Sequence, residues 1–311
     1  MRSPINVLIV GFGDIGERVA SRLRGRFNFN VSALVRDARR ETVARALSVH
    51  PVRGDLRKPG SLQKIAGCAD VIFHFAPPPG KGGRDSNTRN LLAALSPKSS
   101  FHAVCPAFSP RAKGLPRRLI YISTTGVYGD CKGAWIDESQ PPRPATGRAR
   151  RRVDAERALQ AWGRRFGVMV SILRAPGIYA DDRLPLDRLR RGTPALAAED
   201  DVFTNHIHAD DLARAAIAAM RYGKAGRIYN VVDDSAMAMA EYFDLVADAF
   251  SLPRPPRLTR AEAVKRVPPT MMSFMSESRR IGNARLKREL RFRLMFPTVN
   301  DFLRTGATPK N

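Results

Sequence analysis

The sequence predicts an α/β fold in which a doubly wound parallel sheet is covered by helices on both faces. Short apolar segments alternate with helical segments up to Val232, and glycines join the first apolar segment to the first helix. Strands that alternate with helices form parallel sheets, because each helix returns the chain to the same edge of the sheet. After residue 179 the composition becomes charged and proline-punctuated, which indicates a smaller mixed α/β region.

The first strand and helix are joined by a glycine-rich turn. Residues 7–10 are apolar, and Gly11, Gly13 and Gly16 follow in the spacing G-x-G-x-x-G. In a dinucleotide site the first glycine allows the tight turn, the second lets the backbone approach the pyrophosphate, and the third lets the helix pack closely. The free N–H groups of the helix N-terminus then face the anion. We expect a Rossmann-type site with these cofactor contacts: Gly11, Phe12, Gly13, Asp14, Ile15 and Gly16. An ordinary strand-turn-helix corner is the alternative.

The second strand, residues 30–35, ends in basic residues that bear on the choice of cofactor. An acidic residue at this place would bind the ribose hydroxyls of NAD, whereas an arginine accommodates the 2′-phosphate of NADP. Arg36 is therefore the expected phosphate ligand, with Arg39 and Arg40 beside it. NADP(H) is the expected cofactor and NAD the second choice. A solvated basic loop is the other interpretation.

Three further strands are expected to end beside the cofactor, because the carboxyl ends of parallel strands meet at one edge of the sheet. They are residues 52–56, residues 70–76, which run into a proline-rich loop, and residues 118–130, which contain several hydroxyls. A helix is predicted over 85–95. The cofactor contacts expected at these strand ends are Asp55, Leu56, Ala76, Pro77 and Ser123.

The remaining elements define two expected domains. A helix over 149–166 and a strand over 169–179 complete the first, a cofactor-binding domain of residues 1–179. Residues 180–311 form the smaller substrate-binding region, from which residues 205–232 return to the Rossmann core with a helix over 212–220 and a strand over 227–232. Further helices are expected over 240–250 and 283–290.

Composition limits the classes of partner. The 53 Lys and Arg residues exceed the 29 Asp and Glu residues, for a net charge of +24. The basic residues are dispersed, without a helix-turn-helix or an aromatic-interleaved basic module, so no specific nucleic-acid partner is expected. No apolar run is long enough to span a membrane, and the start of the chain does not resemble a secretion signal. We expect a cytoplasmic protein.

Cysteines and histidines do not predict a metal site. Cys68, Cys105 and Cys131 lack the paired spacing of zinc ligands or of a disulfide framework. His206 and His208 are two residues apart on an extended segment, and we expect their side chains to point to opposite faces. No bound metal is therefore predicted.

Several motifs occur in the order found in one family of enzymes. The glycine turn is followed by Gly54-Asp55-Leu56, by the residues 123–129 (STTGVYG), by 173–179 (LRAPGIY) and by 206–213 (HIHADDLA). Together they resemble the extended short-chain dehydrogenase/reductases, more narrowly the NAD(P)-dependent epimerase/dehydratase branch. The resemblance implies hydride transfer with a sugar-nucleotide-like or other small carbonyl or hydroxyl substrate, and a homodimer. The G-x-G-x-x-G spacing, tighter than the G-x-x-G-x-x-G usual in extended members, is similar to that of atypical ones.

The same resemblance locates the expected catalytic residues. In the family a tyrosine and a lysine four residues later exchange the substrate proton, and a hydroxyl at the end of the fifth strand holds the same oxygen. Thr124 matches the hydroxyl, but counting back from Ala155-Glu156 puts Arg148 at the tyrosine position and Arg152 at the lysine position. Because a guanidinium stays protonated, it cannot shuttle a proton.

Two interpretations of this replacement remain open. Arg148 and Arg152 bind an anion, either the cofactor phosphate or an acidic substrate, or they belong to a solvated helix start. Tyr128 and Tyr179 are the two tyrosines that could substitute for the missing one, but we expect both to be structural. Arg279 or Arg280 is a further candidate to reach a phosphate. Two functions follow: an NADP(H)-dependent oxidoreductase or epimerase in which Thr124 positions the substrate oxygen, or a catalytically impaired NADP-binding sensor or scaffold.

Overall fold

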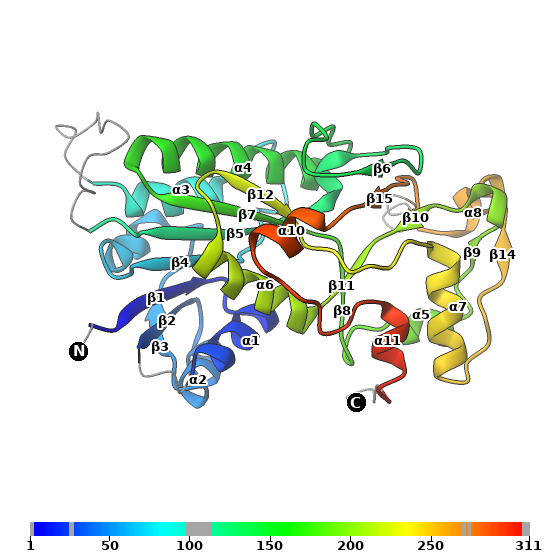
Figure 1. The fold of residues 1–311 in the computed structure, drawn as a ribbon, viewed down its shortest axis with the longest axis horizontal. Coiled ribbons are helices and arrows are strands. Elements are labelled where there is room, and N and C mark those ends of the chain that lie inside the picture. Colours follow the sequence, from blue (N-terminus) through cyan, green and yellow to red (C-terminus); the bar gives the residue numbers. More distant parts are fainter. Residues whose placement is uncertain (1–2, 25–27, 98–113, 269–271, 273–274, 307–311) are drawn as a thin grey trace.

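The chain forms a seven-stranded parallel sheet with a smaller lobe beside it (Figure 1). The computed structural model describes residues 3–24, 28–97, 114–268, 272 and 275–306. The sheet has the strand order β12-β7-β5-β4-β1-β2-β3, and every neighbouring pair is parallel. The order reverses between β1 and β4, and a ligand crevice is expected outside the carboxyl ends of the strands at such a point. The doubly wound α/β fold predicted from the sequence is confirmed.

The strands of the central sheet are β1 (Ile5–Val10), β2 (Phe29–Val35), β3 (His50–Arg53), β4 (Val71–His74), β5 (Arg118–Thr124), β7 (Met169–Ala175) and β12 (Arg227–Asn230). The elements that cover them are α1 (Asp14–Leu23), α2 (Ala38–Ala46), η1 (Pro59–Ile65), α3 (Ser86–Leu95), η3 (Thr125–Tyr128), α4 (Gly147–Phe166), α6 (Ala209–Tyr222) and α10 (Ala284–Glu289).

The elements beside the sheet are β6 (Trp135–Ile136), β8 (Gly177–Tyr179), α5 (Leu186–Arg190), β9 (Ala195–Leu196), η4 (Ala198–Asp200), β10 (Phe203–Thr204), β11 (His206–His208), β13 (Met237–Ala238), α7 (Met239–Ala249), β14 (Arg257–Leu258), α8 (Arg260–Arg266), β15 (Arg280–Ile281) and α11 (Val299–Leu303). They pair as short two-stranded sheets: β10 with β13, β11 with β8, β14 with β9 and β15 with β6.

Alternation along the strands creates two buried layers. In β1, Val7 and Ile9 pack into one core with α1, α2, α6 and α10, whereas Leu8 and Val10 pack into a second core with η1, α3 and α4. Successive strand side chains point to opposite faces, so a strand buried on both faces is apolar throughout. A third core, with Phe243 and Val246 of α7 and Phe302 of α11, fills the lobe at the right of Figure 1.

Several predicted strand boundaries differ from the structure, and three strands differ most. The strand expected over 118–130 ends at Thr124, because the Thr124 side chain accepts the Gly126 N–H and caps η3. The strand expected over 169–179 is interrupted at Pro176, which has no N–H to donate to a ladder, and its end becomes β8. The strand expected over 52–56 begins two residues earlier and ends at Arg53. None of the helices within the described ranges is both apolar enough and long enough to cross a bilayer.

Candidate functional site

The glycine turn brings the end of β1 against the end of β4. Gly11 has a φ of +92°, and a Cβ atom there would lie 2.3 Å from the backbone nitrogen of Ala76. A Cβ on Gly16 would lie 3.0 Å from the Gly11 carbonyl oxygen and 3.1 Å from Ile9 Cγ2. A Cβ on Gly13, in contrast, would meet nothing within 4 Å. Two glycines thus serve close packing, and the third leaves open space.

That open space belongs to a pocket of about 420 Å³ at the carboxyl edge of β1, β2 and β4. From the glycine turn, Gly11, Phe12 and Gly13 line it. The other expected cofactor contacts that line it are Arg36, Asp55, Leu56, Ala76 and Pro77. The volume is that of an ordinary small-molecule or cofactor site.

One end of this pocket, here called the basic end, is lined by Arg36, Arg40 and Arg57. Arg40 Nη1 lies 2.5 Å from Glu17 Oε1, and Arg57 Nη2 lies 2.7 Å from Asp55 Oδ2. The hydrogen bonds from Arg57 lower the pKa of Asp55 to about 2. Three cations against two carboxylates leave the basic end suited to an anion. Arg57 was not among the predicted contacts, although it directly follows Asp55 and Leu56, which were.

The acidic residue nearest the end of β2 has a structural role. The Asp37 side chain accepts the backbone N–H of Arg40 at 3.0 Å and so caps α2. A capping carboxylate stabilises the helix start and holds Arg40 in place. Arg39, in contrast, is exposed and is not part of the pocket lining.

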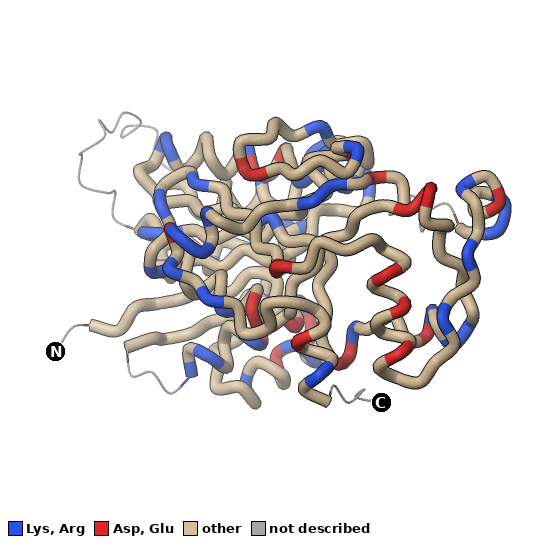
Figure 2. Tube along the Cα trace, turned by 45° about the vertical axis from the view of Figure 1, so that its right-hand side comes forward, with Lys and Arg blue, Asp and Glu red and all other residues tan. Residues whose placement is uncertain are grey.

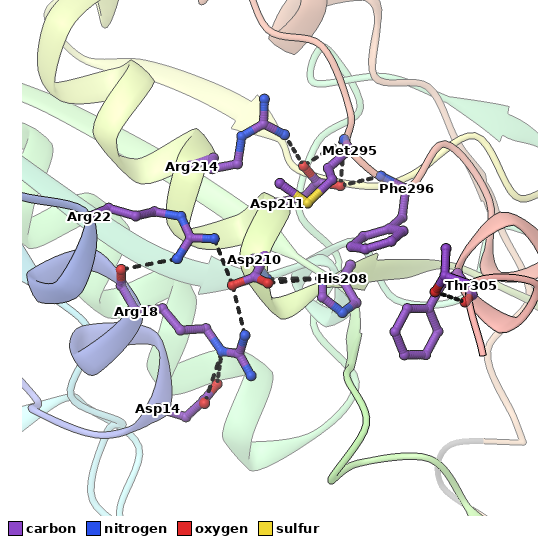
Figure 3. Close-up of polar contacts among 11 residues, drawn as sticks. Asp14, Arg18, Arg22, His208, Asp210, Asp211, Arg214, Met295, Phe296 and Thr305 are labelled. Atoms are coloured by element: carbon purple, nitrogen blue, oxygen red, sulfur yellow. Dashed lines mark hydrogen bonds and ion pairs between the residues drawn. The ribbon is translucent and has the colours of Figure 1, made fainter. Parts of the chain in front are cut away.

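Four expected cofactor contacts lie outside the pocket lining: Asp14, Ile15, Gly16 and Ser123. Asp14 forms an ion pair with Arg18 at 3.0 Å and another with Arg183 at 3.0 Å. Figure 3 shows Arg18 and Arg22 converging on Asp210, at 2.7 and 2.9 Å. These ion pairs from the second and last turns fasten α1 to α6. Ser123 is buried, and its hydroxyl finds no hydrogen-bond partner among the described residues.

A second pocket, of about 290 Å³, lies at the carboxyl end of β5 and the start of α4. Thr124 and Arg148, which the family resemblance assigns to one site, both line it. Thr146, Glu277 and Arg279 line it as well. Arg279 Nη1 donates to the Gly129 carbonyl at 2.8 Å and lies 2.8 Å from Glu277 Oε2. Glu277 was missed because no pattern within its own segment connects it to α4.

Arg152 is not part of either pocket lining. Its Nη1 donates to the Tyr121 hydroxyl at 2.9 Å and to the Ile122 carbonyl at 2.8 Å, and its guanidinium lies 5.5 Å from the Tyr121 ring centroid. The residue at the lysine position therefore ties α4 to β5. Burial raises the pKa of Tyr121 to about 12, so this hydroxyl stays protonated at neutral pH.

The two tyrosines expected to be structural are buried and contribute to neither pocket lining. The Tyr128 hydroxyl donates to Asn230 Oδ1 at 2.6 Å, and the Arg174 guanidinium lies 4.6 Å from its ring centroid. Tyr179 packs with its ring 5.3 Å from that of His208. Both tyrosine side chains therefore pack in the protein interior.

The prediction that His206 and His208 point to opposite faces is wrong. Both rings pack on Tyr179, at centroid distances of 6.3 and 5.3 Å, because residues two apart in a strand share a face. Burial lowers the pKa of His206 to about 3, which keeps it neutral. Within the described ranges no three His, Cys, Asp or Glu side chains are grouped as metal ligands. Cys68 and Cys131 are free thiols, and Cys105 lies outside the described residues.

Comparison with known proteins shows the family. The family model for the NAD dependent epimerase/dehydratase family matches residues 7–232. The chain is 26% identical over 243 residues to GDP-6-deoxy-D-mannose reductase of Pseudomonas aeruginosa, covering 70% of this chain and 77% of the relative. It is also 26% identical over 132 residues to human dTDP-D-glucose 4,6-dehydratase, a match to 40% of this chain and only 38% of that protein's length.

A solved structure shows the same fold over nearly the whole chain. The fold superposes with a TM-score of 0.77 on a functionally unknown conserved protein from Silicibacter pomeroyi DSS, with 26% identity over 98% of this chain and 100% of the other. The family match includes the glycine turn and both pockets' strand ends. The chain belongs to the NAD dependent epimerase/dehydratase family.

Proposed function

We propose that this protein binds NADP(H), with the adenosine 2′-phosphate at the basic end of the larger pocket. The observation that carries the proposal is the joint lining of one pocket by the glycine turn and by Arg36, Arg40 and Arg57. Open space at Gly13 lets the backbone approach a pyrophosphate, and the N-terminus of α1 offers free N–H groups to it. Guanidinium groups bind phosphate through paired charge-assisted hydrogen bonds, which favours NADP(H) over NAD.

The reaction we propose is that of an oxidoreductase or epimerase. The substrate is a sugar-nucleotide-like or other small carbonyl or hydroxyl compound, and the second pocket holds it. A bound nicotinamide supplies or takes the hydride. Thr124 accepts the Gly126 N–H at 3.2 Å, so its own O–H is free to donate to a substrate oxygen and orient it.

The proposal is tested by the affinities of NADPH and NADH for the wild type, Arg36→Met and Arg39→Met. Both variants lose one exposed arginine, but only Arg36 lines the pocket. Loss of a charge-assisted bond should weaken NADPH binding by about 10–100-fold in Arg36→Met, with little change for NADH. Arg39→Met should bind both as the wild type does. Absence of NADPH binding in the wild type would reject the proposal.

A second candidate function is a cofactor-binding sensor or scaffold without turnover. It is favoured by Arg148 at the position of the family tyrosine, because a guanidinium cannot exchange a proton at physiological pH. Tight NADPH binding, with no hydride transfer to a broad panel of carbonyl compounds and sugar nucleotides, would support this candidate. Turnover that depends on Thr124 would exclude it.

The proposed setting is the cytoplasm, with a homodimer and without a specific nucleic-acid partner. Figure 2 shows Lys and Arg distributed along the whole trace with Asp and Glu among them. Light scattering of the purified chain measures the oligomeric state. Binding of a DNA oligonucleotide that is tight at moderate salt and falls steeply with added salt would contradict the absence of such a partner.

A further inference from the structure

The second pocket holds more positive than negative charge. Arg148 and Arg279 both line it, and Glu277 is the one carboxylate among the lining residues that the structure describes. Glu277 lies 2.8 Å from Arg279, which offsets that cation. A neutral carbonyl group alone would not require this charge.

Two hydroxyls in the pocket are arranged as donors. Thr124 Oγ1 accepts the Gly126 N–H at 3.2 Å, and Thr146 Oγ1 accepts the Ala149 N–H at 3.1 Å. Because a hydroxyl that accepts from the backbone keeps its own hydrogen, each can donate one hydrogen bond. Both threonines line the pocket together with Arg148. These two hydroxyls and the Arg148 guanidinium give the pocket several hydrogen-bond donors.

The start of α4 adds to the positive potential. This helix is 20 residues long, begins at Gly147 and has no acidic residue in its first turn. Its N-terminal dipole has the same sign as the Arg148 charge. Desolvation and the nearby Arg152 cation lower the pKa of Arg148, although Glu277 acts in the other direction. A negative group bound beside Arg148 would offset the cost of desolvation and the repulsion from Arg152.

We propose that the substrate of the second pocket carries a carboxylate or phosphate group, and that Arg148 binds it. This assignment rests on the proposed function and specifies it: the substrate is a small anionic carbonyl or hydroxyl compound. Thr124, which lines the same pocket, orients the reacting oxygen, and Phe203 and Met239 add apolar surface to the lining. Arg148 thus binds the substrate instead of moving its proton.

The test uses the full chain with saturating NADPH, which occupies the larger pocket. Isothermal calorimetry measures the binding of two probes, malonate and inorganic phosphate, to the wild type, Arg148→Met and Arg150→Met. Arg150 is the matched control, since it is an exposed arginine on the same helix turn, donates to the Ala145 carbonyl at 2.8 Å and is not part of the pocket lining. Both variants lose the same charge.

We expect at least one probe to bind the wild type, Arg148→Met to weaken its binding by about 10–100-fold, and Arg150→Met to change it less than about threefold. The probe that binds more tightly identifies the anion as carboxylate or phosphate. Failure of both probes to bind the wild type, or equal affinity in the two variants, would overturn the assignment. NADPH affinity is measured separately: if NADPH does not bind, anion binding that depends on Arg148 in the cofactor-free protein still supports the assignment, while the proposed function fails.

Discussion

Replacing Gly13 with alanine should weaken cofactor binding while leaving the stability of the fold almost unchanged. Gly13 is the N-cap of α1, with φ −114° and ψ −163°, a conformation open to alanine, and a Cβ there meets nothing within 4 Å. An alanine N-cap costs about 0.5–1 kcal/mol relative to glycine, and the reduced entropy of the unfolded chain offsets about 0.4–1 kcal/mol. The free energy of unfolding should therefore change by less than about 1 kcal/mol.

The effect on binding should be larger. The added methyl group occupies space in the pocket where the backbone would approach the pyrophosphate. Displacing the anion from one charge-assisted hydrogen bond costs about 1.5–3 kcal/mol, which predicts NADPH binding weakened by about 10–100-fold. NADPH fluorescence measures the affinity, and thermal unfolding measures the stability.

Gly60→Ala is the matched control for Gly13→Ala. A Cβ on Gly60 also meets nothing within 4 Å, and Gly60 is not part of the pocket lining. This variant should bind NADPH as the wild type does. If Gly13→Ala binds NADPH with unchanged affinity, or if it unfolds several degrees earlier than Gly60→Ala, Gly13 does not have the proposed role of leaving space for the pyrophosphate.

Three further predictions concern stability. Gly11→Ala should lower the free energy of unfolding, measured in urea, by more than about 3 kcal/mol, because the cost of the positive φ adds to the cost of the clash with the Ala76 backbone. A decrease of less than about 1 kcal/mol would contradict the described turn. Glu156→Gln leaves the buried Arg174 cation unpaired and should cost about 3–5 kcal/mol, far more than Asp248→Asn at an exposed pair. Burial raises the pKa of Asp233 from 3.8 to about 8. Between these two pH values, the Asp233 carboxyl is protonated in the folded state and ionised in the unfolded state. Wild-type stability should therefore fall as pH rises from about 4 to about 8 relative to Asp233→Asn, and parallel profiles would contradict the shift.

Much of the fold could be predicted because it depends on local patterns. Apolar runs that alternate with helices predict a parallel sheet, and the glycine spacing predicts a turn in which Gly11 and Gly16 pack against backbone. Strand ends were less accurate, since the end of β5 depends on a hydrogen bond from Gly126 to the Thr124 side chain, which the pattern of apolar residues does not reveal.

The parts of the site that sequence reasoning missed depend on distant segments. Arg183 reaches Asp14 from the loop after β8, and Glu277 meets Arg148 in one pocket although the two lie far apart along the chain. Arg152 was grouped with Arg148 by its place in the family pattern, yet the structure directs it to Tyr121. Residues four positions apart lie on the same face of a helix, but long side chains on that face can reach different partners, and the sequence does not reveal which partner each one reaches.

A crystal structure of the chain with bound NADPH would show directly which residues hold the cofactor. We expect the pyrophosphate at the Gly11–Gly13 turn, the adenosine 2′-phosphate within hydrogen-bond distance of Arg36, and the nicotinamide beside Thr124. A cofactor bound with its 2′-phosphate away from Arg36, Arg40 and Arg57, or a larger pocket left empty at saturating NADPH, would contradict it.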